Sequence, residues 1–155
     1  MQTVIDITTG TVSLSASGQT VTGSSTAFTS ADIGKYIQFS SSDDWYKVTA
    51  VASTDSLTIE SPYVGTSALS GGTYILRKML YSTSSSVEKI LSMRPSVTPR
   101  KLTLVPFRQF DIFKPSPSTS STPELYVPWG YDSSSLWTFS FYPVPSEALN
   151  LDIRF

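Results

Sequence analysis

Residues 36–59 read YIQFSSSDDWYKVTAVASTDSLTI and contain three runs in which apolar and polar side chains alternate. In the first run Ile37 and Phe39 occupy alternate positions, and in the third run Leu57 and Ile59 do the same. A period of two places one set of side chains on one face of a pleated strand. The intervening Ser and Asp residues favour tight turns, because their side chains hydrogen-bond to nearby backbone. This stretch therefore predicts a meander of three antiparallel strands.

The same alternation recurs near both ends of the sequence. Residues 11–22 alternate Thr or Ser with Val, Leu and Ala, which indicates a hairpin with a hydroxyl-rich outer face. Residues 149–155 alternate Leu, Leu, Ile and Phe with Asn, Asp and Arg, and they form the clearest strand pattern in the chain. Between these regions, Ser30 to Gly34 predicts a single helical turn, in which Ser30 caps the start and Gly34 ends it in a left-handed conformation.

One segment has helical spacing. Over Ser86–Met93 the apolar residues recur at i, i+3 and i+4, and Ser85 with Glu88 fits a capping box. Pro95 follows closely and disfavours continuation of the helix. Because two turns are too short to be stable alone, we expect this helix to dock on a sheet. The apolar positions are Val87, Ile90 and Leu91.

The composition supports a β fold. Ser and Thr make up 48 of the 155 residues, whereas charged residues are only 15%. Long soluble helices need more Glu, Lys, Ala and Leu, while Thr, Tyr, Phe, Val and Ile suit pleated sheet. We predict an all-β protein, an antiparallel sandwich or barrel of about nine strands with one short helix.

The length corresponds to one domain. We expect a single β domain over residues 1–155, with a division into a meander of residues 1–80 and a second half of residues 81–155 as the alternative. Residues 115–123 consist only of Pro, Ser and Thr, which predicts a surface loop.

The sequence contains no His and no Cys. Ser-His-Asp and Cys-His systems and Cys-based metal sites therefore cannot be built from this chain. We expect no enzyme activity, no cofactor and no metal. Asp43 and Asp44 are the only adjacent carboxylates, but hard cations need several converging oxygens, so a solvated turn is the favoured interpretation.

Charge is distributed unevenly along the chain, although the net charge is only −1. Residues 77–114 contain eight basic and two acidic residues, a net of +6, so the remaining residues carry −7. Such a contrast predicts an assembly interface, with a solvated basic face or a DNA-facing channel as the alternatives. The candidate interface residues are Arg77, Lys78, Arg94, Arg100, Lys101 and Arg108.

Exposed aromatic residues would provide a different kind of site. The candidates for a ligand platform are Trp129, Tyr131, Trp137 and Tyr142. Trp129 and Tyr131 flank a Gly in a predicted turn and are expected to be the more exposed pair, because half of the aromatic residues in strands should face the core. Packing in the core or at a corner of the fold is the favoured interpretation, because large aromatic residues are usually buried.

The order of these strand and turn motifs resembles the β-region of tailed-bacteriophage virion proteins, in particular the head-to-tail connector, or adaptor, ring protein beneath the portal. The resemblance covers roughly residues 10–155. Adaptor proteins usually carry helices on both sides of this region, whereas strands occupy both ends here, so the chain would be a β-only member, a fragment or another virion part. The matching segments are TAFTSADIGKYI (26–37), WYKV (45–48), SLTI (56–59), PY (62–63), GTY (72–74), PELY (123–126) and FYPVP (141–145).

The resemblance implies a structural role. The chain would be one subunit of a homo-oligomeric ring in the virion, which assembles in the host cytoplasm. Its neighbours would be portal and tail proteins, and DNA could pass through the channel of the ring. No membrane contact is expected. The alternative is a tail-tip or fibre module that binds a host receptor or a carbohydrate. The uneven charge and the family motifs favour the first function, and exposure of Trp129 and Tyr131 would favour the second.

Overall fold

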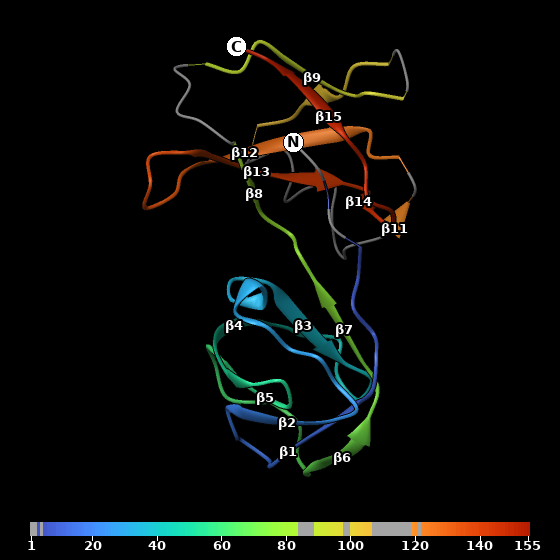
Figure 1. Cartoon of the computed structure of the whole chain (residues 1–155), viewed down its shortest axis with the longest axis vertical. Coiled ribbons are helices and arrows are strands. Elements are labelled where there is room, and N and C mark those ends of the chain that lie inside the picture. Colours follow the sequence, from blue (N-terminus) through green and yellow to red (C-terminus); the bar gives the residue numbers. More distant parts are fainter. Residues whose placement is uncertain (1–2, 4, 84–88, 98–99, 107–118, 121) are drawn as a thin grey trace. The chain divides into compact units, whose positions relative to one another are not determined.

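The computed structural model describes residues 3, 5–83, 89–97, 100–106, 119–120 and 122–155 (Figure 1). These residues form fifteen strands and a single turn of 3-10 helix, so the predicted all-β class is confirmed. The strand count exceeds the predicted nine because several strands are only two residues long. Segments this short carry no readable alternation.

The chain forms two compact units, where the sequence favoured a single domain. Residues Asp6–Lys78 make up one, called here the barrel unit. Residues Met1–Ile5 and Met79–Phe155 make up the other, called here the C-terminal unit. The backbone therefore passes from one unit to the other twice, at residues 5–6 and again at residues 78–79.

A curled antiparallel sheet of seven strands forms the barrel unit, in the order β6-β1-β2-β5-β4-β3-β7. β6 and β7 stand at opposite ends of this order, yet only Thr73 separates them in the sequence. The two ends of the sheet are thus joined covalently, and the sheet closes on itself. The strands are β1 (Thr11–Leu14), β2 (Thr20–Ser24), β3 (Tyr36–Phe39), β4 (Trp45–Ser53), β5 (Ser56–Ile59), β6 (Leu69–Gly72) and β7 (Tyr74–Arg77).

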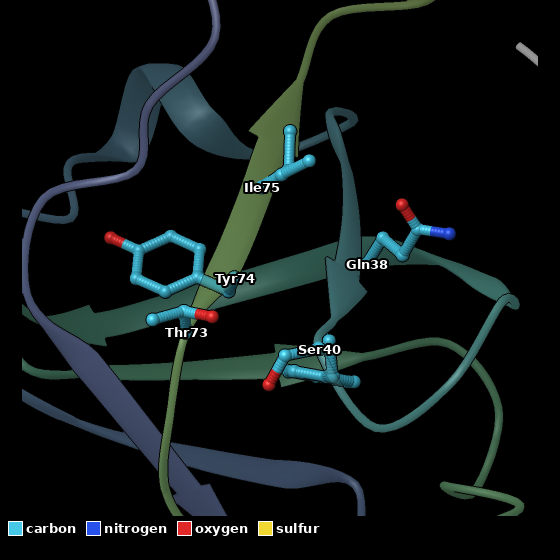
Figure 2. A pocket seen from close by; sticks show the side chains of 6 residues that line it. Gln38, Ser40, Thr73, Tyr74 and Ile75 are labelled. Atoms are coloured by element: carbon cyan, nitrogen blue, oxygen red, sulfur yellow. The ribbon is translucent and has the colours of Figure 1, made fainter.

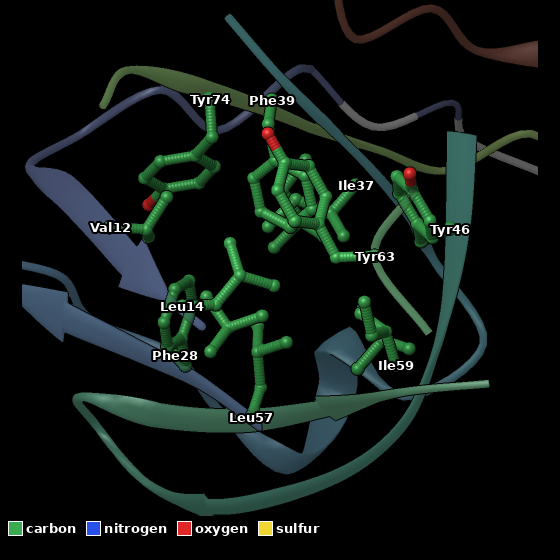
Figure 3. Close-up of a cluster of buried hydrophobic side chains, with 13 residues drawn as sticks. Val12, Leu14, Phe28, Ile37, Phe39, Tyr46, Leu57, Ile59, Tyr63 and Tyr74 are labelled. Carbon is green, nitrogen blue, oxygen red and sulfur yellow. The ribbon is translucent and has the colours of Figure 1, made fainter. Parts of the chain in front are cut away.

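The alternating residues of these strands fill the interior of the barrel unit (Figure 3). On β3, Ile37 and Phe39 are buried while Tyr36 and Gln38 are half-buried, as the period of two predicts. Each fully buried side chain of this size stabilises the fold by about 1.5–3 kcal/mol. The cluster consists of Val12, Leu14, Val21, Phe28, Ile37, Phe39, Tyr46, Val48, Leu57, Ile59, Tyr63, Tyr74 and Leu76.

The predicted helical turn is present as a 3-10 helix over Ser30–Asp32. Gly34 has φ +85°, the left-handed conformation expected at its end. Thr29, and not Ser30, is the N-cap residue, so the predicted capping position is wrong by one residue.

The C-terminal unit contains three smaller sheets. Its four-stranded sheet has the order β10-β12-β13-β8, and β9 pairs with β15 while β11 pairs with β14. The β10–β12 and β11–β14 pairs are parallel, whereas the sequence predicted antiparallel pairing. The strands are β8 (Tyr81–Ser82), β9 (Ser92–Pro95), β10 (Thr103–Leu104), β11 (Thr119–Ser120), β12 (Leu125–Tyr131), β13 (Trp137–Tyr142), β14 (Val144–Pro145) and β15 (Leu151–Arg154).

The core of the C-terminal unit joins one face of the four-stranded sheet to the β9–β15 pair. Phe139 and Phe141 on β13 pack in one cluster with Met93 on β9 and Leu151 on β15. A second, smaller cluster around Val127 forms on the other face of β12. The sheet is therefore covered on both faces over part of its length.

The predicted helix over Ser86–Met93 is wrong for the residues that the structure describes. Residues 86–88 lie outside them, residues 89–91 are not helical, and Ser92 and Met93 belong to β9. Pairing with β15 supplies the backbone hydrogen bonds that a helix would have provided, for example from Leu91 N–H to the Arg154 carbonyl at 2.8 Å. Tertiary pairing has overridden a local helical pattern.

The predicted surface loop over residues 115–123 lies mostly outside the described residues. Within it, Thr119 and Ser120 form β11, which pairs with β14, and Pro123 is buried. The Pro- and Ser-rich composition thus did not exclude a short strand.

Candidate functional site

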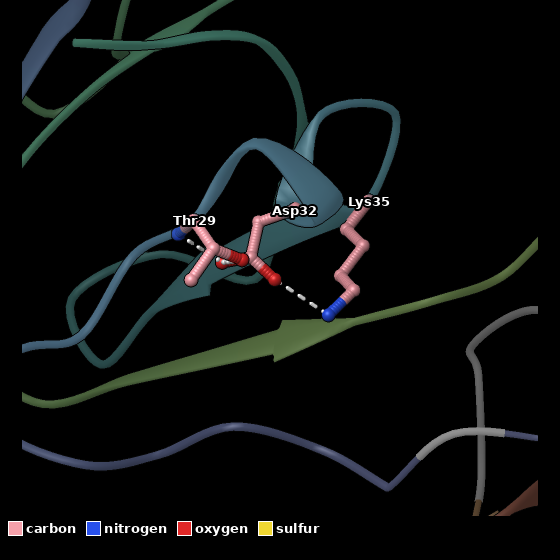
Figure 4. A network of polar contacts seen from close by, with 3 residues as sticks. All are labelled: Thr29, Asp32 and Lys35. Atoms are coloured by element: carbon pink, nitrogen blue, oxygen red, sulfur yellow. Dashed lines mark hydrogen bonds and ion pairs between the residues drawn. The ribbon is translucent and has the colours of Figure 1, made fainter. Parts of the chain in front are cut away.

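A buried ion pair ends the 3-10 turn (Figure 4). One carboxylate oxygen of Asp32 accepts a hydrogen bond from Lys35 Nζ at 2.6 Å, and the other accepts the Thr29 backbone N–H at 2.8 Å. The Asp32 and Lys35 side chains are 3% and 10% exposed. Both charges are paired, as buried charges must be. Sequence analysis missed this pair, although its i, i+3 spacing was available as a signal.

Arg77 forms a second ion pair, with Asp6. Its Nε and Nη2 atoms donate hydrogen bonds to the two carboxylate oxygens of Asp6, at 2.9 and 2.6 Å. Its guanidinium carbon lies 4.9 Å from the centroid of the Trp45 ring, within the range of a cation–π interaction. Because Arg77 is only 5% exposed, its prediction as a surface interface residue needs correction. Its bidentate geometry is that of a structural clamp.

The other predicted interface residues occupy different surroundings. Lys78 is half-buried at the end of the barrel unit, and burial, together with the charge of Lys35, lowers its pKa. Arg94 lies 3.4 Å from the Asp152 carboxylate in an exposed ion pair. Arg100 and Lys101 are exposed and line a pocket of about 130 Å³ that also contains Glu124. Arg108 lies outside the described residues.

The charge contrast along the sequence does not become a contrast between the units. The C-terminal unit contains seven basic and six acidic residues, a net of +1, and the barrel unit contains four basic and six acidic residues, a net of −2. Acidic residues late in the sequence share a unit with the basic segment and largely neutralise it. The net charges of the two units are therefore too small to support long-range electrostatic steering of one subunit toward another.

Trp129 and Tyr131 are exposed, so the favoured interpretation of core packing is wrong for both. They lie within β12, which extends as far as Tyr131, and not in a turn. The exposed fractions are 46% for Trp129 and 57% for Tyr131.

A β-bulge separates these two side chains. Pro128 pairs with Phe139 but Gly130 pairs with Thr138, so Trp129 is the extra residue, and Gly130 has φ +118°. The Trp129 indole N–H donates to Ser140 Oγ at 2.8 Å, which places Trp129 on the face of Ser140. Tyr131 instead pairs with Trp137 on the opposite face. The predicted platform of Trp129 with Tyr131 is therefore split between two faces.

Trp137, one of the four sequence candidates, is the partner of Tyr131, a pairing that the sequence did not predict. The two ring centroids lie 4.7 Å apart, with 46° between the ring planes. Its alternation with Phe139 was readable, but its contact with Tyr131 depends on the register that the bulge sets. This shift could not be read from the sequence.

A pocket of about 200 Å³ opens on the barrel unit between β3 and β7 (Figure 2). Its lining holds no charged side chain, and two of its polar side chains make structural hydrogen bonds. The Gln38 amide donates to the Asp43 carbonyl at 3.0 Å, and the Tyr74 hydroxyl donates to the Thr9 carbonyl at 2.7 Å. Burial, and secondarily the Asp32 charge, raises the pKa of Tyr74. The pocket is smaller than the roughly 300–1,000 Å³ of typical ligand sites.

Asp43 and Asp44 lie in an exposed turn between β3 and β4. The Asp44 backbone N–H donates to Ser42 Oγ at 3.1 Å, and Ser42 Oγ donates to the Asp44 carboxylate at 3.2 Å. Within the described ranges, no group of three or more Asp or Glu residues is placed to hold a metal ion. These contacts are those of a hydrogen-bonded turn.

Comparison with known proteins gave no match to a family model, a curated protein or a solved structure. In the part of the chain that the structure describes, no helix is both long and apolar enough to cross a membrane.

Proposed function

We propose that this chain is a structural virion protein of a tailed bacteriophage, a subunit of the head-to-tail connector ring between portal and tail. The observation that carries the assembly role is the distribution of exposed apolar side chains. Nine large ones are exposed among the described residues, and seven of these belong to the C-terminal unit. Exposed apolar side chains that lie close together often mark contacts with another protein. The seven are Ile5, Leu91, Val97, Leu104, Trp129, Tyr131 and Phe155.

Two of these side chains lie at the same end of the β9–β15 pair. Leu91 N–H donates to the Arg154 carbonyl just beyond the last pair of the ladder, Arg154 with Ser92, and Phe155 follows Arg154 in the chain. The exposed fractions of Leu91 and Phe155 are 65% and 69%. Exposed apolar side chains at the end of a strand ladder are well suited to the centre of a subunit contact, where desolvated side chains contribute most of the binding energy.

The specific place in a phage particle rests on the sequence resemblance. The all-β fold agrees with that expectation, and the exposed cations Arg94, Arg100 and Lys101 lie in the unit that carries the apolar excess. Charged residues around an apolar contact chiefly set orientation and association rate. The proposal assigns them this role in ordering subunits around the ring.

The experiment is a molar-mass measurement by light scattering, with electron microscopy of the same sample. We expect a closed ring of uniform size, because head-to-tail contacts that close generate cyclic oligomers. Leu91→Ser should weaken ring formation, and so should Phe155→Ser.

Val64→Ser is the matched control, because Val64 is 65% exposed like Leu91 but belongs to the barrel unit. It should leave the ring intact. A wild-type protein that stays monomeric at every concentration tested would contradict the proposal, as would equal effects of Leu91→Ser and Val64→Ser.

A further inference from the structure

The free end of the β12–β13 hairpin carries a pair of aromatic side chains, Tyr131 and Trp137, called here the aromatic tip. They face each other across the two strands, with ring centroids 4.7 Å apart. Tyr131 is 57% exposed. The pair thus offers a ring surface at a position fixed by strand pairing.

The aromatic tip lies on the same face of the hairpin as the buried core residues, beyond the part of that face that the core covers. Alternation along β13 puts Trp137 on the same face as Phe139 and Phe141, both of which are buried in the core. At the tip this face becomes solvent-accessible, but its residues remain aromatic in a chain otherwise rich in Ser and Thr. Exposed aromatic residues on a rigid element are typical of recognition surfaces.

The turn beside the tip is ordered and hydroxyl-rich. The Asp132 carboxylate accepts the backbone N–H groups of Ser134 at 2.8 Å and Leu136 at 3.0 Å. The hydrogen bond from Leu136 is the largest cause that lowers the pKa of Asp132, followed by one from the Ser82 side chain and then that from Ser134. Ser133, Ser134 and Ser135 are exposed in the same turn. Rings, hydroxyls and a carboxylate acceptor therefore lie within one short hairpin.

The charge of this region limits the classes of ligand. Residues 122–153 contain four acidic residues and no Lys or Arg. A nucleic acid or an anionic lipid surface would meet no compensating cation in this stretch, although such ligands are held mainly by basic side chains.

The size of the aromatic tip also disfavours a protein partner. Trp or Tyr side chains bury about 150–250 Å² each, whereas a stable protein interface buries about 800 Å² on each partner. The Tyr131 ring, flanked by hydroxyls, matches one sugar unit in size. The C–H face of a sugar stacks on aromatic rings while its hydroxyls exchange hydrogen bonds with polar neighbours.

We propose that the aromatic tip binds a neutral saccharide unit, with Tyr131 stacking on the sugar ring and the Asp132 turn facing its hydroxyls. Ring assembly is assigned to Leu91 and Phe155 at the β9–β15 end. Trp129 and Tyr131, although counted among the exposed apolar side chains of this unit, are not assigned to that contact. Trp129 takes no part in saccharide binding, because the bulge turns it to the other face of the hairpin.

The test is a titration of the full chain with neutral malto-, cello- and chito-oligosaccharides, followed by saturation-transfer NMR and tryptophan fluorescence. We expect at least one series to bind. Tyr131→Ala should weaken that binding about tenfold, the loss that corresponds to one aromatic stacking contact. Tyr131→Phe should retain it, and Trp129→Ala, which removes the ring on the other face, should leave it unchanged.

Ring formation is measured on the same variants, so that the two proposals fail separately. The saccharide proposal is overturned if no series binds at millimolar concentration, or if Tyr131→Ala binds as tightly as the wild type. It is also overturned if Tyr131→Ala abolishes ring formation and no saccharide binds, because the tip would then be a protein contact.

Discussion

At the scale of single residues, the charged side chains with the lowest exposure among the described residues each have an oppositely charged partner within hydrogen-bonding distance. Asp32 is bonded through both carboxylate oxygens, and Arg77 holds Asp6 through two parallel hydrogen bonds. Low local dielectric strengthens such pairs and makes the loss of one partner costly. Removal of one partner from either pair should therefore destabilise the barrel unit.

Replacement of Asp32 tests this interpretation. Asp32→Ala leaves Lys35 buried without its counter-charge, and we expect it to lower the free energy of unfolding by about 3–5 kcal/mol. The measurement is urea denaturation of the purified protein. Lys47→Ala is the control, because the Lys47–Glu60 pair is exposed and 3.9 Å apart; its loss should cost less than about 1 kcal/mol. Similar costs for both variants would contradict the account.

The pH dependence of stability provides a second prediction at this scale. Burial, with a smaller contribution from the Asp32 charge, raises the pKa of Tyr74 above its ordinary value of 10.0. The folded state therefore favours the protonated phenol. This stabilisation is complete below pH 10, and it declines as the pH rises from there through the folded-state pKa.

Thermal unfolding measured at increasing alkaline pH checks this prediction. Tyr74→Phe loses the 2.7 Å bond to Thr9 and should be less stable at neutral pH, but its stability should fall less steeply above about pH 10. A variant that follows the wild-type slope would show that Tyr74 titrates normally.

At the scale of elements, sequence periodicity predicted the strands that fill the barrel unit but not the pairing of the C-terminal unit. The meander over residues 36–59 is present because each strand pairs with its neighbour through a short turn. Ser92–Pro95 is a strand because it pairs with β15, which lies some fifty residues later in the sequence. A local pattern holds no information about a partner so distant.

The candidate site shows the same limit. Trp129 and Tyr131 were identified from residue type and from a predicted turn, and both are exposed, although they lie in a strand. Their separation onto opposite faces follows from a single extra residue in β12, because a one-residue shift reverses the facing of every later side chain. Trp137 became a partner of Tyr131 only through that shift. Sequence patterns identify aromatic candidates, but they do not predict on which face of the hairpin a bulge places each side chain.

Glycine conformation gives a prediction at the element scale. Gly10 precedes β1 with φ +87°, and a Cβ there would lie 2.5 Å from the Ser24 carbonyl oxygen. Gly71 in β6 has φ +61°, but a Cβ there would meet nothing within 4 Å. Gly71→Ala should therefore cost only the left-handed backbone penalty of about 1–2 kcal/mol. Gly10→Ala should cost clearly more, because backbone must also move.

Urea denaturation of the two glycine variants measures the difference. Equal losses would mean that the approach of Gly10 to Ser24 does not constrain the start of β1. The comparison is matched, because both residues belong to the barrel unit and both have positive φ.

At the scale of the whole molecule, the two units differ in where their large exposed apolar side chains lie. The barrel unit is one uninterrupted segment, its sheet closes on itself, and most of its described apolar side chains are inside. The exposed apolar side chains are concentrated in the C-terminal unit. Under the proposed function, we expect the barrel unit to fold independently and the C-terminal unit to provide the assembly contacts.

Isolation of residues 6–78 tests the first of these expectations. The segment contains the whole buried cluster and both partners of the Asp6–Arg77 clamp, so we expect it to fold alone with a sheet-rich dichroism spectrum and one cooperative thermal transition. Asp6→Ala in the same segment should lower its unfolding temperature. A segment without cooperative unfolding would show that the barrel unit depends on the rest of the chain.

Hydrogen exchange of the assembled ring against the dissociated subunit tests the central claim, assembly through the C-terminal unit, most directly. The account predicts added protection of amides at the β9–β15 end, around Leu91 and Phe155, and unchanged exchange throughout the barrel unit. Added protection confined to the barrel unit, or the absence of any assembled species, would contradict it.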